Sequence, residues 1–98
     1  MLVVLGSAVA QEGRFSDLLA LSQQHVARSR AEPGCISHAV HQDTENPLRL
    51  VFVEEWQDLT ALQKHFTVPE SRHFAKAVAE MVSSPPTLVV YEAAPVKL

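Results

Sequence analysis

Several residue types are scarce in this 98-residue sequence, and each scarcity excludes a class of protein. The single cysteine, Cys35, rules out an intrachain disulfide and fits a reducing compartment. The three glycines, at positions 6, 13 and 34, are too dispersed for a phosphate-binding loop. Eight Lys and Arg residues stand against eleven acidic residues and form no cluster, so no surface is suited to nucleic acid.

Long hydrophobic runs are also missing, and none approaches the ~20 residues of a membrane-spanning helix. Residues 2–10 are apolar and end in Ala-Val-Ala, as a signal peptide can, but they are short and follow no basic segment. We therefore expect them to form a strand that the fold requires. These features predict a soluble, cytoplasmic protein with neither a membrane nor a nucleic-acid partner.

The sequence does contain enough apolar material for one small core. Hydrophobic residues make up 47% of the chain, an ordinary value for a globular protein. A chain of this size removes roughly 60–70% of its unfolded surface from water on folding. We expect a single domain over residues 1–98, with its folded core over residues 2–93 and a short tail over residues 94–98.

Periodicity and turn signals predict four strands and two helical regions. Apolar residues recur at helical spacing in the helical regions, and most strands are rich in Val and Leu. Pro69 interrupts the second helical region or begins a new segment, because proline is tolerated only in a first turn. The predicted elements are a strand over 2–10, a helix over 14–30, strands over 35–42 and 48–56, helical segments between residues 58 and 82, and a strand over 87–93.

The element order βαββαβ predicts a ferredoxin-like α+β fold with a four-stranded antiparallel sheet. Two helical regions cover only one face of such a sheet. The strands should then alternate apolar and polar residues if the other face met water. Instead, residues 2–5, 50–53 and 88–91 are apolar on both faces. We therefore expect a second copy to cover that face, sheet against sheet, in a two-fold homodimer.

A series of short motifs follows this element order over nearly the whole chain. In sequence they are Glu32-Pro33-Gly34-Cys35, the turn at Pro47, Phe52-Val53-Glu54-Glu55-Trp56, Ala61-Leu62-x-x-His65, Pro69, Phe74, and Pro86 with Val90-Tyr91-Glu92. Their order and spacing together make the pattern specific. By these motifs the chain resembles the antibiotic biosynthesis monooxygenase family, and in particular its small quinol-monooxygenase-like members.

The resemblance implies a dimeric α+β barrel with a pocket between helices and sheet in each subunit. Family enzymes insert oxygen from O₂ into phenols, anthrones or hydroquinones without flavin, haem or metal. We therefore expect a cofactor-independent monooxygenase, an oxidoreductase that acts on a small aromatic substrate with O₂. Because the family is functionally mixed, two alternatives stay open: a non-catalytic module that binds a small ligand, and an isomerase that works by proton transfer alone.

His65 and Trp56 are the catalytic candidates. Cofactor-free oxygenation needs a group that removes a proton from the substrate and an apolar slot that excludes water. His65 matches the histidine after Ala-Leu-x-x in the family, and an ordinary imidazole can exchange a proton near neutral pH. Trp56 matches the strand-ending aromatic, which would wall the pocket and donate its N–H to the substrate. The structural alternatives are a helix histidine held by a backbone or carboxylate partner, and a core tryptophan.

Four further residues are candidates for substrate binding: His38, Glu54, Phe74 and Tyr91. Glu54 shares a strand face with Trp56, so it could orient a histidine or act as a base. Its structural alternatives are an ion pair across the dimer with an Arg such as Arg49, or simple exposure. His38 stands where the family often has an aromatic residue, and its structural alternative is a half-buried, satisfied histidine. Phe74 and Tyr91 are expected in the core or in the pocket wall.

The sequence predicts no metal site. No two histidines have the i,i+4 spacing of a helix, C-x-x-C and H-E-x-x-H are absent, and His38 and His41 point to opposite faces of a strand. The first strand also lacks the Asn of haem-degrading relatives, and Val78 stands near the position of their iron-binding histidine. We expect no cofactor.

The remaining candidate side chains receive structural assignments. His25 and His73 lie among mostly polar neighbours and are expected on helix surfaces. Cys35 is expected to be a small buried residue, since no nearby charge pattern would activate its thiol.

Overall fold

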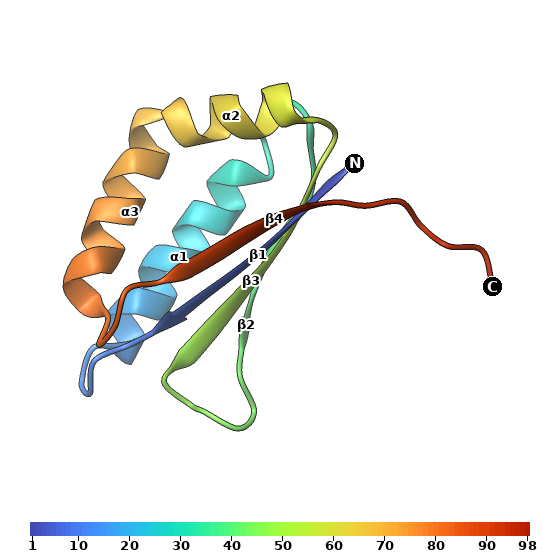
Figure 1. Cartoon of the computed structure of the whole chain (residues 1–98). Helices are drawn as coiled ribbons and strands as arrows, with labels where there is room; N and C mark the ends of the chain where they lie inside the picture. The colour runs from blue at the N-terminus through green and yellow to red at the C-terminus, as the bar shows by residue number, and fades with distance from the viewer.

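A computed structural model describes all 98 residues and shows three helices on one face of a four-stranded sheet (Figure 1). The strands are β1 (Leu2–Val9), β2 (Cys35–Gln42), β3 (Arg49–Trp56) and β4 (Thr87–Glu92), and the helices are α1 (Phe15–Ser29), α2 (Leu59–Thr67) and α3 (Pro69–Met81). This is the predicted ferredoxin-like α+β fold, with the second helical region divided in two. None of the helices has both the length and the apolar character that crossing a membrane requires.

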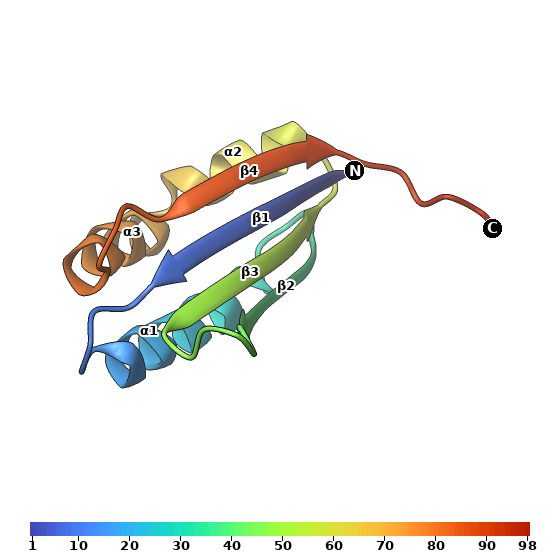
Figure 2. The same ribbon diagram turned by 60° about the horizontal axis from the view of Figure 1, so that its bottom comes forward.

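All neighbouring strands are antiparallel, and they lie in the order β2-β3-β1-β4 (Figure 2). Strand β1 lies between β3 and β4. In its register, Leu2 stands opposite Trp56 of β3 and opposite Glu92 of β4. Figure 1 shows the sheet nearly edge-on, with every helix on one side and the tail after β4 extending away from the body. The other face of the sheet is covered by no element of this chain.

Pro69 divides the second helical region, as its position in the sequence predicts. The preceding residue, Val68, has an extended backbone (φ −62°, ψ 129°), because the proline ring disfavours a helical conformation there. Pro69 itself lies in the first turn of α3, where its missing N–H would have had no partner. Asp58 caps α2, and its Oδ1 accepts the Ala61 N–H at 2.9 Å.

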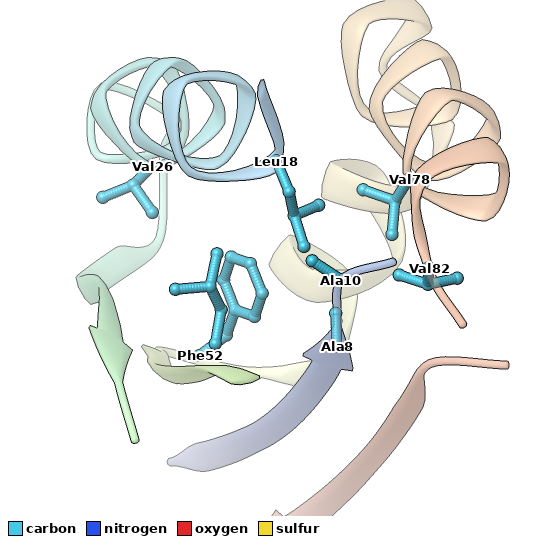
Figure 3. Close-up of a cluster of buried hydrophobic side chains, with 8 residues drawn as sticks. Ala8, Ala10, Leu18, Val26, Phe52, Val78 and Val82 are labelled. Carbon is cyan, nitrogen blue, oxygen red and sulfur yellow. The ribbon is translucent and has the colours of Figure 1, made fainter. Parts of the chain in front are cut away.

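The main hydrophobic core lies between α1, α3 and the sheet (Figure 3). Leu18 of α1 and Val78 of α3 point into it above Phe52 of β3, and full burial of a side chain such as Leu18 stabilises the fold by about 1.5–3 kcal/mol. The cluster consists of Ala8, Ala10, Leu18, Val26, Leu50, Phe52, Val78 and Val82.

A smaller core lies at the other end of β1, beneath α2, and consists of Leu2, Val4, Trp56 and Leu62. On β3 the helix-facing residue Glu54 therefore stands between Phe52 of one core and Trp56 of the other. A carboxylate at this point needs polar partners, because an unpaired buried charge is strongly destabilising. The polar cluster described below supplies them.

The face of the sheet opposite the helices is largely apolar. Val3, Leu5 and Val53 alternate with the helix-facing residues of β1 and β3, so they point away from the helices. Val89 and Tyr91 of β4 pair with Leu5 and Val3 and share that face. Leu5, Val89 and Tyr91 are 42%, 46% and 50% exposed. The expectation that the strands are apolar on both faces is confirmed.

Gly34 lies in the turn between α1 and β2 and packs against the start of α2. Its φ of +86° favours glycine, and a Cβ at this position would overlap the Cβ of Ala61. Its carbonyl oxygen accepts the N–H of Gln57 at 2.8 Å. The Glu32-Pro33-Gly34 turn therefore packs closely against the helix that carries His65.

Candidate functional site

Three histidine rings from three different elements meet beneath the helices. His25 belongs to α1, His38 to β2 and His65 to α2, and all three are buried. The ring centroids lie 5.4 Å apart for His25 and His38, 5.3 Å for His25 and His65, and 5.8 Å for His38 and His65. Buried polar rings require partners, so the contacts of each ring decide what the cluster can do.

His65 is held by a carboxylate. Its Nδ1 lies 2.9 Å from Oε1 of Glu32, and the other oxygen of Glu32 accepts a hydrogen bond from Nη1 of Arg28 at 3.1 Å. An ionised carboxylate only accepts hydrogen bonds, so it places the proton of neutral His65 on Nδ1 and leaves a lone pair on Nε2. An imidazole oriented in this way is suited to act as a general base.

Glu54 lies between His38 and Trp56. Its Oε1 accepts the indole N–H of Trp56 at 2.9 Å and lies 3.1 Å from Nε2 of His38. This contact with Nε2 is close but not well aligned, and Nδ1 of His38 has no polar partner at all. Burial would raise the pKa of Glu54, but His38 and the indole N–H outweigh it and hold that pKa below its ordinary value. Glu54 is therefore an anion at neutral pH.

His25 is buried, so the expectation that it lies on a helix surface is wrong. Its ring stacks on Phe74, with centroids 3.9 Å apart and planes inclined by 2°. Its Nδ1 lies 2.7 Å from Nη2 of Arg28, which can only donate. Burial first, and then the charges of His38, His65 and Arg28, lower the pKa of His25 from 6.5 to about 3. The ring is neutral at physiological pH.

A cavity of about 190 Å³ opens beside the cluster, between α2, α3 and the β1–β4 side of the sheet. Its polar wall includes His25, His65 and Glu54, and Phe52 and Phe74 provide aromatic walls. The other lining residues are mostly small or apolar: Gly6, Ser7, Ala8, Phe66, Ser71, Ala75, Val78, Pro86, Thr87 and Leu88. An apolar concavity with a few convergent polar groups is typical of small-molecule sites.

A wider groove of about 430 Å³ runs between α1 and α3 and shares only His25 and Phe74 with this cavity. Most of its lining residues are polar or charged, and it is more open to solvent. Chemistry that must exclude water is better served by the smaller space. We therefore take the 190 Å³ cavity as the candidate site.

Three of the six predicted site residues, His65, Glu54 and Phe74, line the cavity. Trp56 is completely buried, and its N–H already donates to Glu54, so the expected hydrogen bond to a substrate has no free donor. The Trp56 ring lies with its centroid 4.7 Å from that of His65. Trp56 therefore contacts the cavity residues Glu54 and His65 but does not itself line the cavity.

The other two predicted residues, His38 and Tyr91, do not line the cavity. His38 is buried behind Glu54. Tyr91 is half-exposed on the face of the sheet away from the helices, so this side chain does not line the cavity. Arg49 points to that same open face and binds Ser7 Oγ at 2.8 Å, whereas Glu54 points towards the helices, so the two side chains do not meet within the chain.

Sequence reasoning missed His25, Arg28 and Glu32. For His25 a signal existed, since it falls at helical spacing with the buried residues Ser22 and Ser29 of α1. For Glu32 there was no such signal, because its partner His65 lies 33 residues further along the chain. His73 is exposed, as expected.

Cys35 is half-buried at the start of β2. Burial raises the pKa of its thiol, and the negative charges of Glu54 and Glu32 add to this effect. The thiol is therefore not activated as a nucleophile, in agreement with its structural assignment.

The helix-covered antiparallel sheet and the buried polar cluster define a ferredoxin-like α+β protein with an internal cavity next to ionisable residues. The sequence profile of the family described as "Antibiotic biosynthesis monooxygenase" matches residues 1–79. The chain belongs to this family, and the resemblance recognised from its motifs is confirmed.

The chain is also similar to individual proteins and solved structures. An uncharacterized protein of Synechocystis sp., sll1783, is 30% identical over 93 residues, and the match covers 95% of this chain but only 63% of that protein. The crystal structure of an antibiotic biosynthesis monooxygenase is 26% identical over 97% of this chain and 100% of its own, with a TM-score of 0.89. Rv0793 from Mycobacterium tuberculosis is 25% identical over 99% of this chain and 96% of its own, with a TM-score of 0.88.

The lowered pKa of His25 predicts that acid destabilises the fold. Between pH 6.5 and about 3 the unfolded chain binds a proton at His25 that the folded chain does not, so the free energy of unfolding decreases as the pH falls. The slope is up to about 1.4 kcal/mol per pH unit. The lowered pKa of Glu54 acts in the same direction at more acidic pH, since its contribution is lost on protonation.

Urea unfolding at pH 7.5, 6.5, 5.5 and 4.5, with a chelator present, measures this slope. His25→Gln is the matched variant and should flatten the profile below pH 6.5. Equal stability of the unmodified protein at pH 7.5 and 4.5 would contradict the assignment of His25 as a neutral, desolvated ring.

Proposed function

We propose that this protein is a cofactor-independent monooxygenase that oxidises a small hydroquinone or related phenol with O₂. The observation that carries the proposal is the Glu32–His65 pair at the wall of a mostly apolar cavity. Family membership supports the reaction class. The free Nε2 of His65 would accept the hydroxyl proton of a substrate in this cavity.

The overall reaction needs no external reductant. The substrate loses two hydrogens and gains one oxygen atom, and the second atom of O₂ leaves as water. Deprotonation gives an electron-rich anion that can pass one electron to O₂, and the resulting radical pair combines to a peroxide that loses water. The cavity would keep bulk water away from this intermediate.

Other side chains of the cavity would position the substrate. Phe52 and Phe74 offer flat apolar surfaces for a ring. The Ser71 oxygen accepts from Arg28 at 3.3 Å, which leaves its own hydrogen free to donate. Glu54 stays ionised, and its bond with the Trp56 N–H holds it in place next to the cavity.

The size of the cavity favours the smaller substrates of the class. Sites for drug-sized ligands measure roughly 300–1,000 Å³. The volume of about 190 Å³ suits a substrate of one or two rings better than a three-ring anthrone. We therefore place hydroquinones and simple phenols first among the candidate substrates.

The same proposal includes a homodimer. The apolar residues of the open sheet face, Val3, Leu5, Val53, Val89 and Tyr91 among them, would be covered by the same face of a second copy. A two-fold axis satisfies this requirement, because one self-complementary surface then covers both partners. The sheets of the two copies would form the dimeric α+β barrel that the family resemblance implies.

Oxygen-electrode measurements test the activity directly. Benzene-1,4-diol, naphthalene-1,4-diol and anthrone are offered in chelator-containing buffer, and the rate without protein is subtracted. We expect stoichiometric O₂ uptake and an oxygenated product, fastest with the diols. Product without O₂ uptake would instead identify an isomerase, and tight binding without product would identify a ligand-binding module.

Gly6→Ala tests whether the cavity is the substrate site. The new Cβ would lie 3.5 Å from Phe52 Cβ, an ordinary contact, but it would occupy space on the cavity floor. One methyl group in a pocket changes binding by about 1–3 kcal/mol, so we expect KM for the best diol to rise roughly tenfold with an unchanged melting temperature. Ala20→Ser, on the solvent side of α1, is the control. An unchanged KM in Gly6→Ala would place the substrate elsewhere.

A further inference from the structure

We propose that His25, His38 and His65 together form a binding site for a divalent transition metal. Three imidazole nitrogens are a donor set that first-row ions such as Zn²⁺ and Cu²⁺ accept. One potential ligand atom of each ring lies within 4.8 Å of the other two. The rings come from α1, β2 and α2, which is why local histidine spacing in the sequence gave no metal signal.

The ring positions fit a metal at the centre of the cluster. A metal about 2.1 Å from each nitrogen lies about 3.2 Å from each ring centroid, and tetrahedral angles then place the centroids about 5.2 Å apart. The observed separations are 5.3, 5.4 and 5.8 Å. The spacing of the rings therefore suits one shared metal, towards which the nitrogens, now within 4.8 Å of one another, would have to turn.

Two of the three histidine rings each have a carboxylate next to one ring nitrogen. Glu32 lies 2.9 Å from Nδ1 of His65, and Glu54 lies 3.1 Å from Nε2 of His38. Metal-binding histidines commonly donate their other N–H to such groups, which orient the ring and make it a stronger ligand. The two carboxylates bring two negative charges to the site, of which the Arg28 guanidinium offsets one, and they leave His65 Nε2 and His38 Nδ1 available.

His38 supplies an independent indication of a missing partner. The residue is only 2% exposed; its Nε2 faces Glu54 at 3.1 Å, but its Nδ1 has no hydrogen-bond partner. An unsatisfied buried polar group costs about 1–3 kcal/mol, so such groups are rare in folded proteins. Coordination through Nδ1 would satisfy the ring.

His25 joins the site through Nε2 only if Arg28 releases Nδ1. While Arg28 donates to Nδ1 at 2.7 Å, the single proton of the neutral ring stays on Nε2. Arg28 has two other partners in place, Glu32 at 3.1 Å and Ser71 at 3.3 Å. A small rotation of the guanidinium towards them lets the His25 proton move to Nδ1 and frees Nε2.

A metal at this point would take the nitrogen of His65 that the proposed oxygenation needs as a base. Metal binding and base catalysis would then exclude one another. Only this consequence rests on the proposed function. The binding site itself rests on the cluster geometry and is tested without any activity measurement.

The test is isothermal titration of the full chain, stripped of metal with a chelator and dialysed, with ZnCl₂. We expect one zinc ion per chain. His38→Gln and His65→Gln should weaken binding at least 100-fold, and Glu32→Gln should weaken it about 10–100-fold because it removes a supporting carboxylate. The matched controls are His41→Gln and His73→Gln, two exposed histidines outside the cluster, which should bind as the unmodified chain does.

A second test titrates the unmodified chain with Co²⁺, so its result does not depend on whether the variants fold. Coordination by three imidazoles should give the intense visible absorption of tetrahedral cobalt, and a stoichiometric excess of zinc should abolish it. The weak spectrum of hydrated octahedral cobalt would overturn the proposal. Absence of zinc binding, or binding that only the His41 and His73 variants weaken, would overturn it equally.

Discussion

Replacing His65 with Gln is expected to lower the rate of O₂ consumption about 10²–10⁴-fold, the usual contribution of a positioned general base. Glutamine retains hydrogen-bonding capacity and similar bulk but cannot accept the substrate proton at neutral pH. Because His65 is buried and bound to Glu32, the variant is first checked for an intact circular dichroism spectrum. The measurement is kcat with the best diol at saturating O₂ in chelator-containing buffer.

Two further variants define the role of His65. Glu32→Gln should lower kcat less than His65→Gln, since it loosens the orientation of the imidazole without removing it. His73→Gln, exposed on α3, should retain the full rate. If His65→Gln folds and turns over diols at the unmodified rate, His65 is not the base, and the proposed mechanism fails.

Val53→Lys is expected to convert the proposed dimer to a monomer at micromolar concentration. Val53 lies on the open sheet face, paired with Leu5 on one side and Ala39 on the other. Two-fold symmetry would bury the new charge twice, and an unpaired buried charge costs several kcal/mol. The dissociation constant should therefore rise more than about 100-fold, since each 1.4 kcal/mol is a factor of ten.

Sedimentation velocity from 1 to 100 μM measures this change. Ala20→Lys introduces the same charge on the solvent side of α1 and should leave the dimer intact. A monomeric unmodified protein over the whole concentration range would contradict the dimer. An unchanged dimer in Val53→Lys would show that the interface lies on another surface.

The fold was predictable because each local signal agreed with the final packing. The Asp58 cap, the break at Pro69 and the glycine turn at Gly34 are decided by backbone chemistry within a few residues. Strand parity placed Glu54 and Trp56 on one face, and the structure joins them by a hydrogen bond. The same parity indicated the apolar open face of the sheet, which the structure also shows.

The site was less predictable, because its contacts join distant elements. The Glu32–His65 pair and the three-histidine cluster depend on how α1, β2 and α2 pack, and no local spacing records that. His25 was misjudged from its polar sequence neighbours, although its position on the helix indicated the buried stripe. Parity also did not reveal that Tyr91 faces away from the helices, because it gives alternation but not which face is covered.

A crystal structure with a non-oxidisable phenol bound under anaerobic conditions tests the proposed site most directly. We expect the ring between Phe52 and Phe74 in the 190 Å³ cavity, with its hydroxyl about 2.6–3.2 Å from Nε2 of His65. A phenol bound in the groove between α1 and α3, or on the open face of the sheet, would contradict the assignment of this cavity as the place of reaction.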